Sequence, residues 1–109
     1  LHMLTRRAEV RPGQAVLVVA GASGVGSAAI QIAKHLGARV ITTARSDAKR
    51  DLCMKLGADA VVDPSQRDWP AEVRRLTDKR GVDLVIEHVG GPLLEQVFHC
   101  LARGGTVVT

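Results

Sequence analysis

The stretch VVAGASGVGSAAIQIAK, residues 18–34, places a glycine-rich bend between a short apolar run and a long run of small residues. The bend carries Gly21, Gly24 and Gly26, with Ser23 between the first two. Glycines let the chain turn sharply and let a helix start close to the strand before it. The stretch therefore predicts a strand, a tight turn and a helix in succession.

The residues on either side of the bend support this prediction. The run AVLVVA, residues 15–20, is rich in valine and apolar at every position, which is typical of a buried parallel strand. From residue 24 to residue 36, apolar side chains recur at helical spacing, and Gly37 is placed to end the helix.

The alternation of strand and helix continues through the chain. Further strands are predicted at 39–43, 60–63, 83–89 and 106–109. Further helices begin at Ser46, at Asp68–Pro70 and at Pro92. The last helix is predicted to include Leu101 and to end at Gly104 or Gly105. This order predicts an α/β protein with a doubly wound parallel sheet, the Rossmann fold.

One domain accounts for the whole chain of 109 residues. Residues 1–10 read as the inside of a helix, and the chain stops on its last predicted strand. We therefore expect residues 1–109 to be a single domain, truncated at both ends. A sheet that stops at 106–109 leaves one strand edge unpaired, and bare edges recruit partners. A homo-oligomer, in the simplest case a dimer, is expected.

The composition argues against several other classes of protein. Aromatic residues make up 2% of the chain and the net charge of +4 is scattered, so we expect no nucleic-acid partner. No apolar run approaches about 18 residues, so no membrane partner is expected. Cys53 and Cys100 stand alone, which predicts two buried thiols, no zinc site and a cytoplasmic location.

Glycines in such a bend suit the binding of a dinucleotide. The first permits the turn, the second lets the backbone approach a pyrophosphate, and the third lets helix and strand pack closely. The helix N-terminus adds N–H groups and a partial positive charge. Gly21, Gly24 and Gly26 fit these roles, and the Ser23 hydroxyl is able to donate to the pyrophosphate. The other interpretation is a glycine-rich connection that binds no ligand.

The end of the second strand distinguishes the two nicotinamide cofactors. NAD sites commonly have an Asp or Glu there to bind the ribose 2′-hydroxyl, whereas this position is Ala44. Arg45, Ser46 and Lys49 follow and offer charge and a hydroxyl to a 2′-phosphate, so NADP is predicted rather than NAD. Asp47 is the only acid expected nearby. The competing interpretation is a surface loop whose basic side chains are merely solvated.

The whole pattern resembles the cofactor-binding domain of the medium-chain dehydrogenases/reductases, the superfamily of zinc alcohol dehydrogenases and quinone oxidoreductases. The motifs that carry the resemblance are GVG followed by AAIQIAK, KLGAD before a short strand, GVDLVIEHVG, and LARGGTVV. They cover essentially the whole chain.

The resemblance implies a place for each candidate residue. The pyrophosphate would be held by Gly21, Ala22, Ser23, Gly24, Val25 and Gly26. The adenosine ribose would be surrounded by Ala44, Arg45, Ser46 and Lys49. Val89 and Gly90 would approach the adenosine or the nicotinamide ribose, and Thr109 would lie near the nicotinamide. A serine at position 23 fits the branches that resemble quinone reductases better than the alcohol dehydrogenases.

The resemblance also implies a function. We expect the NADP(H)-binding domain of a two-domain oxidoreductase, which passes a hydride between the nicotinamide and a small-molecule alcohol or carbonyl, quinone or activated alkene. The catalytic domain, with any zinc ligands, would precede residue 1, so the chain alone is expected to be inactive. The alternative is a non-catalytic regulatory module that senses NAD(P).

Overall fold

A five-stranded parallel β-sheet forms the centre of the protein. The computed structural model describes residues 13–19, 24–86, 97 and 99–108. The strands are β1 (Ala15–Val18), β2 (Arg39–Thr43), β3 (Ala60–Val62), β4 (Val82–Ile86) and β5 (Leu101–Val108). They lie in the order β3-β2-β1-β4-β5, and every neighbouring pair is parallel. The winding reverses at β1, which confirms the predicted doubly wound sheet.

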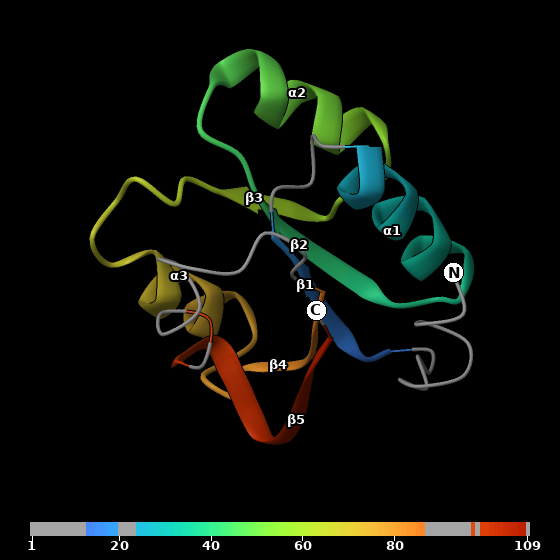
Figure 1. Ribbon diagram of the computed structural model, residues 1–109. Helices are drawn as coiled ribbons and strands as arrows, with labels where there is room; N and C mark the ends of the chain where they lie inside the picture. Colours follow the sequence, from blue (N-terminus) through green and yellow to red (C-terminus); the bar gives the residue numbers. More distant parts are fainter. Residues whose placement is uncertain (1–12, 20–23, 87–96, 98, 109) are drawn as a thin grey trace.

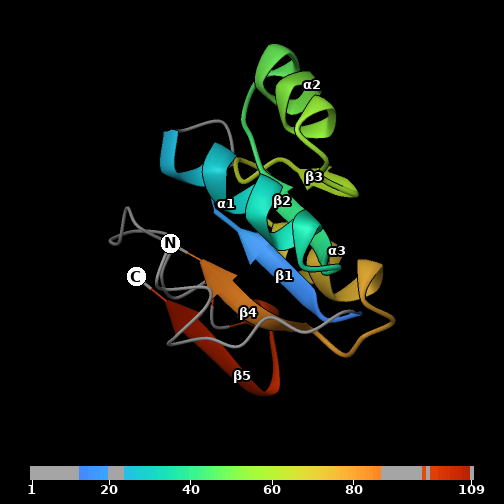
Figure 2. The same cartoon turned by 90° about the vertical axis from the view of Figure 1, so that its right-hand side faces the viewer.

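Helices cover both faces of this sheet (Figures 1 and 2). The helices are α1 (Gly24–His35), α2 (Asp47–Lys55) and α3 (Trp69–Leu76). The first two lie on one face and α3 lies on the other. Val16 and Val18 pack in one core cluster with residues of α1, whereas Leu17 packs in a second cluster with residues of α3. Because both faces are covered, β1 needs apolar side chains at every position.

The helix ends carry the capping residues that the sequence predicts. Gly37, after α1, has a φ of +87°, a conformation that favours glycine. Ser46 is the N-cap of α2, where its Oγ accepts a hydrogen bond from the backbone nitrogen of Lys49 at 3.2 Å. The helix α3 begins after Asp68, with Pro70 in its first turn.

The C-terminal part of the fold differs from the sequence prediction. Helical residues end at Cys100 and β5 begins at Leu101, so the prediction of a helix that continues to Gly104 or Gly105 is wrong. The predicted strand 83–89 is found as β4 up to Ile86, and its last residues lie outside the described part of the chain.

An arginine and a glycine explain why the helix ends early. Arg74 donates through Nη1 to the carbonyl oxygens of His99 and Leu101, at 3.2 and 3.1 Å. In a helix that continued, these carbonyl oxygens would accept hydrogen bonds from the backbone of the next turn. Gly81, with a φ of +83°, lets the start of β4 approach the backbone of Leu101 and Ala102 closely. A Cβ on Gly81 would lie 2.6 Å from the backbone nitrogen of Ala102. The helix end is therefore fixed by long-range contacts.

None of the helices in the described ranges is long and apolar enough to cross a membrane.

Candidate functional site

The carboxyl ends of β1 and β4 lie side by side where the winding of the sheet reverses. The Val19 N–H donates to the carbonyl oxygen of Ile86 at 3.0 Å. The Thr42 hydroxyl, near the end of β2, donates to the carbonyl oxygen of Val18 at 2.6 Å. In doubly wound sheets, ligands bind in the crevice outside this point. The candidate residues after β1 and β2 therefore belong to the expected edge of the sheet.

The start of α1 provides an open surface. Gly24 and Val25 are exposed there, whereas Gly26 is buried, as a glycine that lets helix and strand pack closely would be. No described atom lies within 4 Å of the position that a Cβ on Gly24 would take. The first turn of α1 holds no acidic side chain, so the positive end of the helix dipole is not neutralised from within that turn. These residues fit an anionic group such as a pyrophosphate.

The end of β2 brings the chain from the core to the surface. Ala44 is 5% exposed, and its N–H donates to the carbonyl oxygen of Val62 at 3.1 Å. Arg45, Ser46 and Lys49 are exposed. Within the described ranges, the side chains of Arg45 and Lys49 make no hydrogen bond or ion pair. The Ser46 hydroxyl caps α2 as an acceptor and keeps its own O–H for donation.

Arg50 lies in α2 beside this loop and forms ion pairs within the protein. Its Nη1 donates to the carbonyl oxygen of Ala44 at 3.2 Å and lies 3.6 Å from Oδ2 of Asp63. Its Nη2 bonds the carboxylate of Asp47. The prediction that Asp47 is the only acid nearby is therefore wrong. Because β3 pairs with β2, the residue that follows β3 comes beside the loop that follows β2, and spacing along the chain gives no sign of this.

The carboxylate of Asp63, which pairs with Arg50, is also held by hydrogen bonds from Ser65. Its Oδ1 accepts hydrogen bonds from the hydroxyl of Ser65 at 2.7 Å and from the backbone nitrogen of Ser65 at 2.9 Å. These bonds hold the pKa of Asp63 below its usual value. Burial opposes this effect, and the charges of Arg50 and Arg45 add to the lowering of the pKa. Asp63 is therefore a carboxylate at neutral pH.

The other predicted site residues lie outside the described part of the chain: Gly21, Ala22, Ser23, Val89, Gly90 and Thr109.

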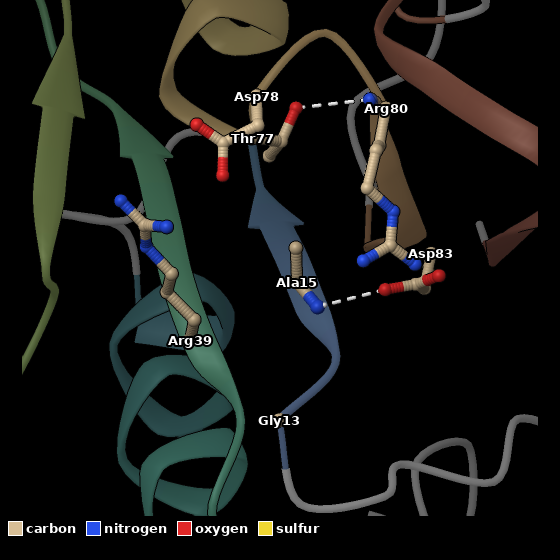
Figure 3. Close-up of a pocket in the computed structure, with 8 residues that line it drawn as sticks. Gly13, Ala15, Arg39, Thr77, Asp78, Arg80 and Asp83 are labelled. Atoms are coloured by element: carbon tan, nitrogen blue, oxygen red, sulfur yellow. Dashed lines mark hydrogen bonds between the residues drawn. The ribbon is translucent and has the colours of Figure 1, made fainter.

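A second concave region lies at the opposite, amino end of the strands (Figure 3). A pocket of about 100 Å³ is lined there by residues of β1, β2 and β4 and of the segment between α3 and β4, among them the exposed Arg39 and Arg80. Asp83 also lines it, and its Oδ2 accepts a hydrogen bond from the backbone nitrogen of Ala15 at 2.9 Å. The side chain of Asp83 thus joins β4 to β1.

The described residues do not fit a zinc ion. Within the ranges that the structure describes, no three His, Cys, Asp or Glu side chains come together as a metal site. Cys53 and Cys100 are both buried and free, as predicted. Burial raises the pKa of the Cys100 thiol to about 12, although the charge of Arg74 opposes this rise.

Most of the chain matches one protein family. The family model described as zinc-binding dehydrogenase matches residues 24–109. The chain belongs to this family. It corresponds to the NAD(P)-binding domain of the medium-chain dehydrogenases/reductases, which confirms the resemblance found in the sequence.

The similar proteins include a polyketide synthase and an alcohol dehydrogenase. A phenolphthiocerol/phthiocerol polyketide synthase of Mycobacterium tuberculosis is 40% identical over 107 residues, which are 98% of this chain and 5% of that protein. The structure of an NAD-dependent alcohol dehydrogenase is 49% identical, with a TM-score of 0.94, over 97% of this chain and 31% of that one.

Two further structures are each 40% identical over 97% of this chain. A putative enoyl reductase domain of a polyketide synthase has a TM-score of 0.87 and is covered over 61% of its length. A mycobacterial protein in complex with NADPH has a TM-score of 0.92 and is covered over 33%. The chain thus spans a small part of its curated relative and about a third of two of these three structures.

Proposed function

We propose that this chain is the NADP(H)-binding domain of an oxidoreductase that passes a hydride between the nicotinamide and an alcohol or carbonyl, a quinone or an activated alkene. The end of β2 carries the proposal. Ala44 leaves no carboxylate for a ribose 2′-hydroxyl, whereas the exposed Arg45 and Lys49 make no ion pair within the described ranges. A 2′-phosphate would meet two cations and the Ser46 hydroxyl there. The similar protein in complex with NADPH supports this cofactor.

The residues of the chain would bind and orient the cofactor. The first turn of α1, with its open surface at Gly24, would hold the pyrophosphate. The loop after β2 would hold the adenosine ribose and its 2′-phosphate. When bound, the cofactor supplies the hydride chemistry, and the protein supplies position and electrostatics.

A titration of both cofactors tests the proposal, because one of the similar structures is named as NAD-dependent. Two contacts to the 2′-phosphate would favour NADPH over NADH by roughly ten- to a hundredfold. Arg45→Ala should weaken NADPH binding and leave NADH binding almost unchanged. Ala44→Asp should reduce the NADPH preference further, because a carboxylate repels the 2′-phosphate and accepts from a 2′-hydroxyl.

An arginine at the other end of β2 provides the matched control. Arg39 is exposed at the first position of the strand, far along it from the loop, so Arg39→Ala should change neither affinity. Circular dichroism of each variant checks the fold. Equal affinities of the wild-type chain for NADPH and NADH, or an Arg45→Ala loss shared by both cofactors, would overturn the proposal.

We propose that catalysis needs a further domain in addition to this chain. The chain covers 31% of the similar alcohol dehydrogenase. We expect no turnover when the 109-residue chain is incubated with NADPH and a panel of aldehydes, quinones and enones. Robust turnover would refute this part of the proposal.

A reducing cytoplasm is the proposed location, since both cysteines are free.

A further inference from the structure

Arg50 connects three elements beside the proposed 2′-phosphate site. Its side chain is 30% exposed and extends from α2. It reaches the carbonyl oxygen of Ala44 after β2 and the carboxylate of Asp63 after β3. The second terminal nitrogen bonds Asp47 in the first turn of α2. The planar fork of a guanidinium can serve these acceptors together, whereas the ammonium of a lysine is a single point charge.

The contact with Ala44 fixes a peptide group of the loop. The carbonyl oxygen of Ala44 belongs to the same planar peptide unit as the backbone nitrogen of Arg45. On the other side, the Ala44 N–H is bonded to the carbonyl oxygen of Val62. Both ends of Ala44 are therefore held, and the direction in which the chain leaves the sheet toward Arg45 is determined.

The charges around Arg50 separate it from the other basic residues. Two carboxylates, Asp47 and Asp63, balance its charge. Arg45 and Lys49 are exposed and make no ion pair within the described ranges. A phosphate would therefore meet exposed cations without an ion pair in the described ranges at Arg45 and Lys49, and a cation with two ion-pair partners at Arg50.

We propose that Arg50 is a positioning residue for cofactor discrimination: it fixes the Ala44–Arg45 peptide and thereby the direction of Arg45, and it does not itself bind the 2′-phosphate. Asp63 orients Arg50 in turn. This inference rests on the proposed NADP binding.

A double-mutant cycle separates positioning from direct binding. The quantity measured is the ratio of the NADH dissociation constant to the NADPH dissociation constant, followed by fluorescence titration. Arg50→Gln should lower this ratio about three- to tenfold, the range of one hydrogen bond. In the background of Arg45→Ala, the same change should have little further effect, because Arg50 acts through Arg45. Additive losses would mean that Arg50 binds the phosphate independently and would overturn the inference.

Two conservative variants keep the test valid if Arg50→Gln folds poorly. Arg50→Lys keeps the positive charge but loses the fork, so it should lose the preference for NADPH as Arg50→Gln does. Full retention of the preference by Arg50→Lys would overturn the positioning role. Asp63→Asn should also lower the ratio, and an increase would mean that Asp63 acts only as a charge that repels phosphate. Asp59→Asn, at the other end of β3, is the matched control and should leave the ratio unchanged.

The wild-type chain and two variants together distinguish the proposed NADP binding from the proposed role of Arg50. A wild-type preference for NADPH that Arg45→Ala removes and Arg50→Lys keeps would leave the proposed function standing and reject the role of Arg50. Equal wild-type affinities would reject both.

Discussion

The Thr42 hydroxyl and the carbonyl oxygen of Val18 are 2.6 Å apart, and both residues are fully buried. The hydrogen bond joins the ends of β2 and β1 through a side chain, next to the reversal of the winding. Backbone bonds alone hold most strand pairs, so this contact adds support where the candidate site requires the strand ends to keep their positions.

Thr42→Val should lower the free energy of unfolding by about 1 kcal/mol, because it keeps the shape of the side chain and removes the donor. Urea denaturation measures this change. Thr106→Val, at an exposed position of β5, is the control and should stay within about 0.5 kcal/mol of the wild-type value. Equal losses at the two sites would contradict the importance of the buried bond.

Alanine at Gly81 should destabilise the protein more than alanine at Gly13. Both glycines have a positive φ, +83° and +84°, so both variants bear a similar backbone strain of about 1–2 kcal/mol. A Cβ on Gly81 would also lie 2.6 Å from the backbone of Leu101 and Ala102, whereas a Cβ on Gly13 would have no atom of the described residues within 4 Å. The clash should add about 2 kcal/mol in thermal or urea unfolding. Similar losses would show that the backbone at Leu101 gives way.

The stability of the protein should fall in acid, in part through Asp59. Its carboxylate accepts from Lys34 Nζ at 2.9 and 3.2 Å and from the Val40 nitrogen at 2.8 Å. Burial raises the pKa of Asp59, but the Val40 N–H and the Lys34 charge outweigh it and hold this pKa below its usual value. A lowered pKa stabilises the fold above the unfolded pKa of about 3.9, and this stabilisation is lost as the pH falls through the folded pKa.

Asp59→Asn should therefore be less stable than the wild-type chain at pH 7, and the two should converge below about pH 4. Denaturation curves at a series of pH values measure this. Asp51→Asn, at an exposed position of α2, serves as the control and should change stability little at any pH. A constant difference between Asp59→Asn and the wild-type chain down to pH 2 would contradict the role of the charge.

Neither cysteine should react with a thiol reagent such as DTNB at pH 8 while the protein is folded. Burial raises the pKa of both thiols, that of Cys100 to about 12, and for Cys53 a hydrogen bond with Thr42 opposes the rise only in part. The thiolate is the reactive form, so both cysteines are protected. In guanidinium chloride both should react. Rapid reaction of either thiol in the folded protein would contradict the burial of these side chains.

We propose that the chain self-associates through β5. Among the described strands, β5 pairs only with β4, and its second edge pairs with none of them. Light scattering at increasing concentration should show a dimer or a larger species. Thr106→Lys should weaken the association, since a lysine on an edge strand discourages pairing. A strict monomer at high concentration would rule this assembly out.

Local signals in the sequence predicted the features that depend on neighbours along the chain. The left-handed Gly37 and the capping Ser46 are such cases, because a helix end is determined within a few residues. Contacts between distant segments were missed. Asp63 reaches Arg50 only because β3 lies beside β2, and Leu101 leaves the helix because a side chain of α3 binds its carbonyl oxygen.

The central place of β1 has a consequence for how the chain folds during synthesis. The contact between Val18 and Thr42 joins residues 24 positions apart, whereas the bond from Ala15 to Asp83 spans 68 positions. We therefore expect the half of the sheet made of β1, β2 and β3 to form first and the pairing of β4 with β1 to follow more slowly. Until the ribosome has released β4, one edge of β1 has no partner from β4, and we expect this edge to be exposed to pairing with other nascent chains.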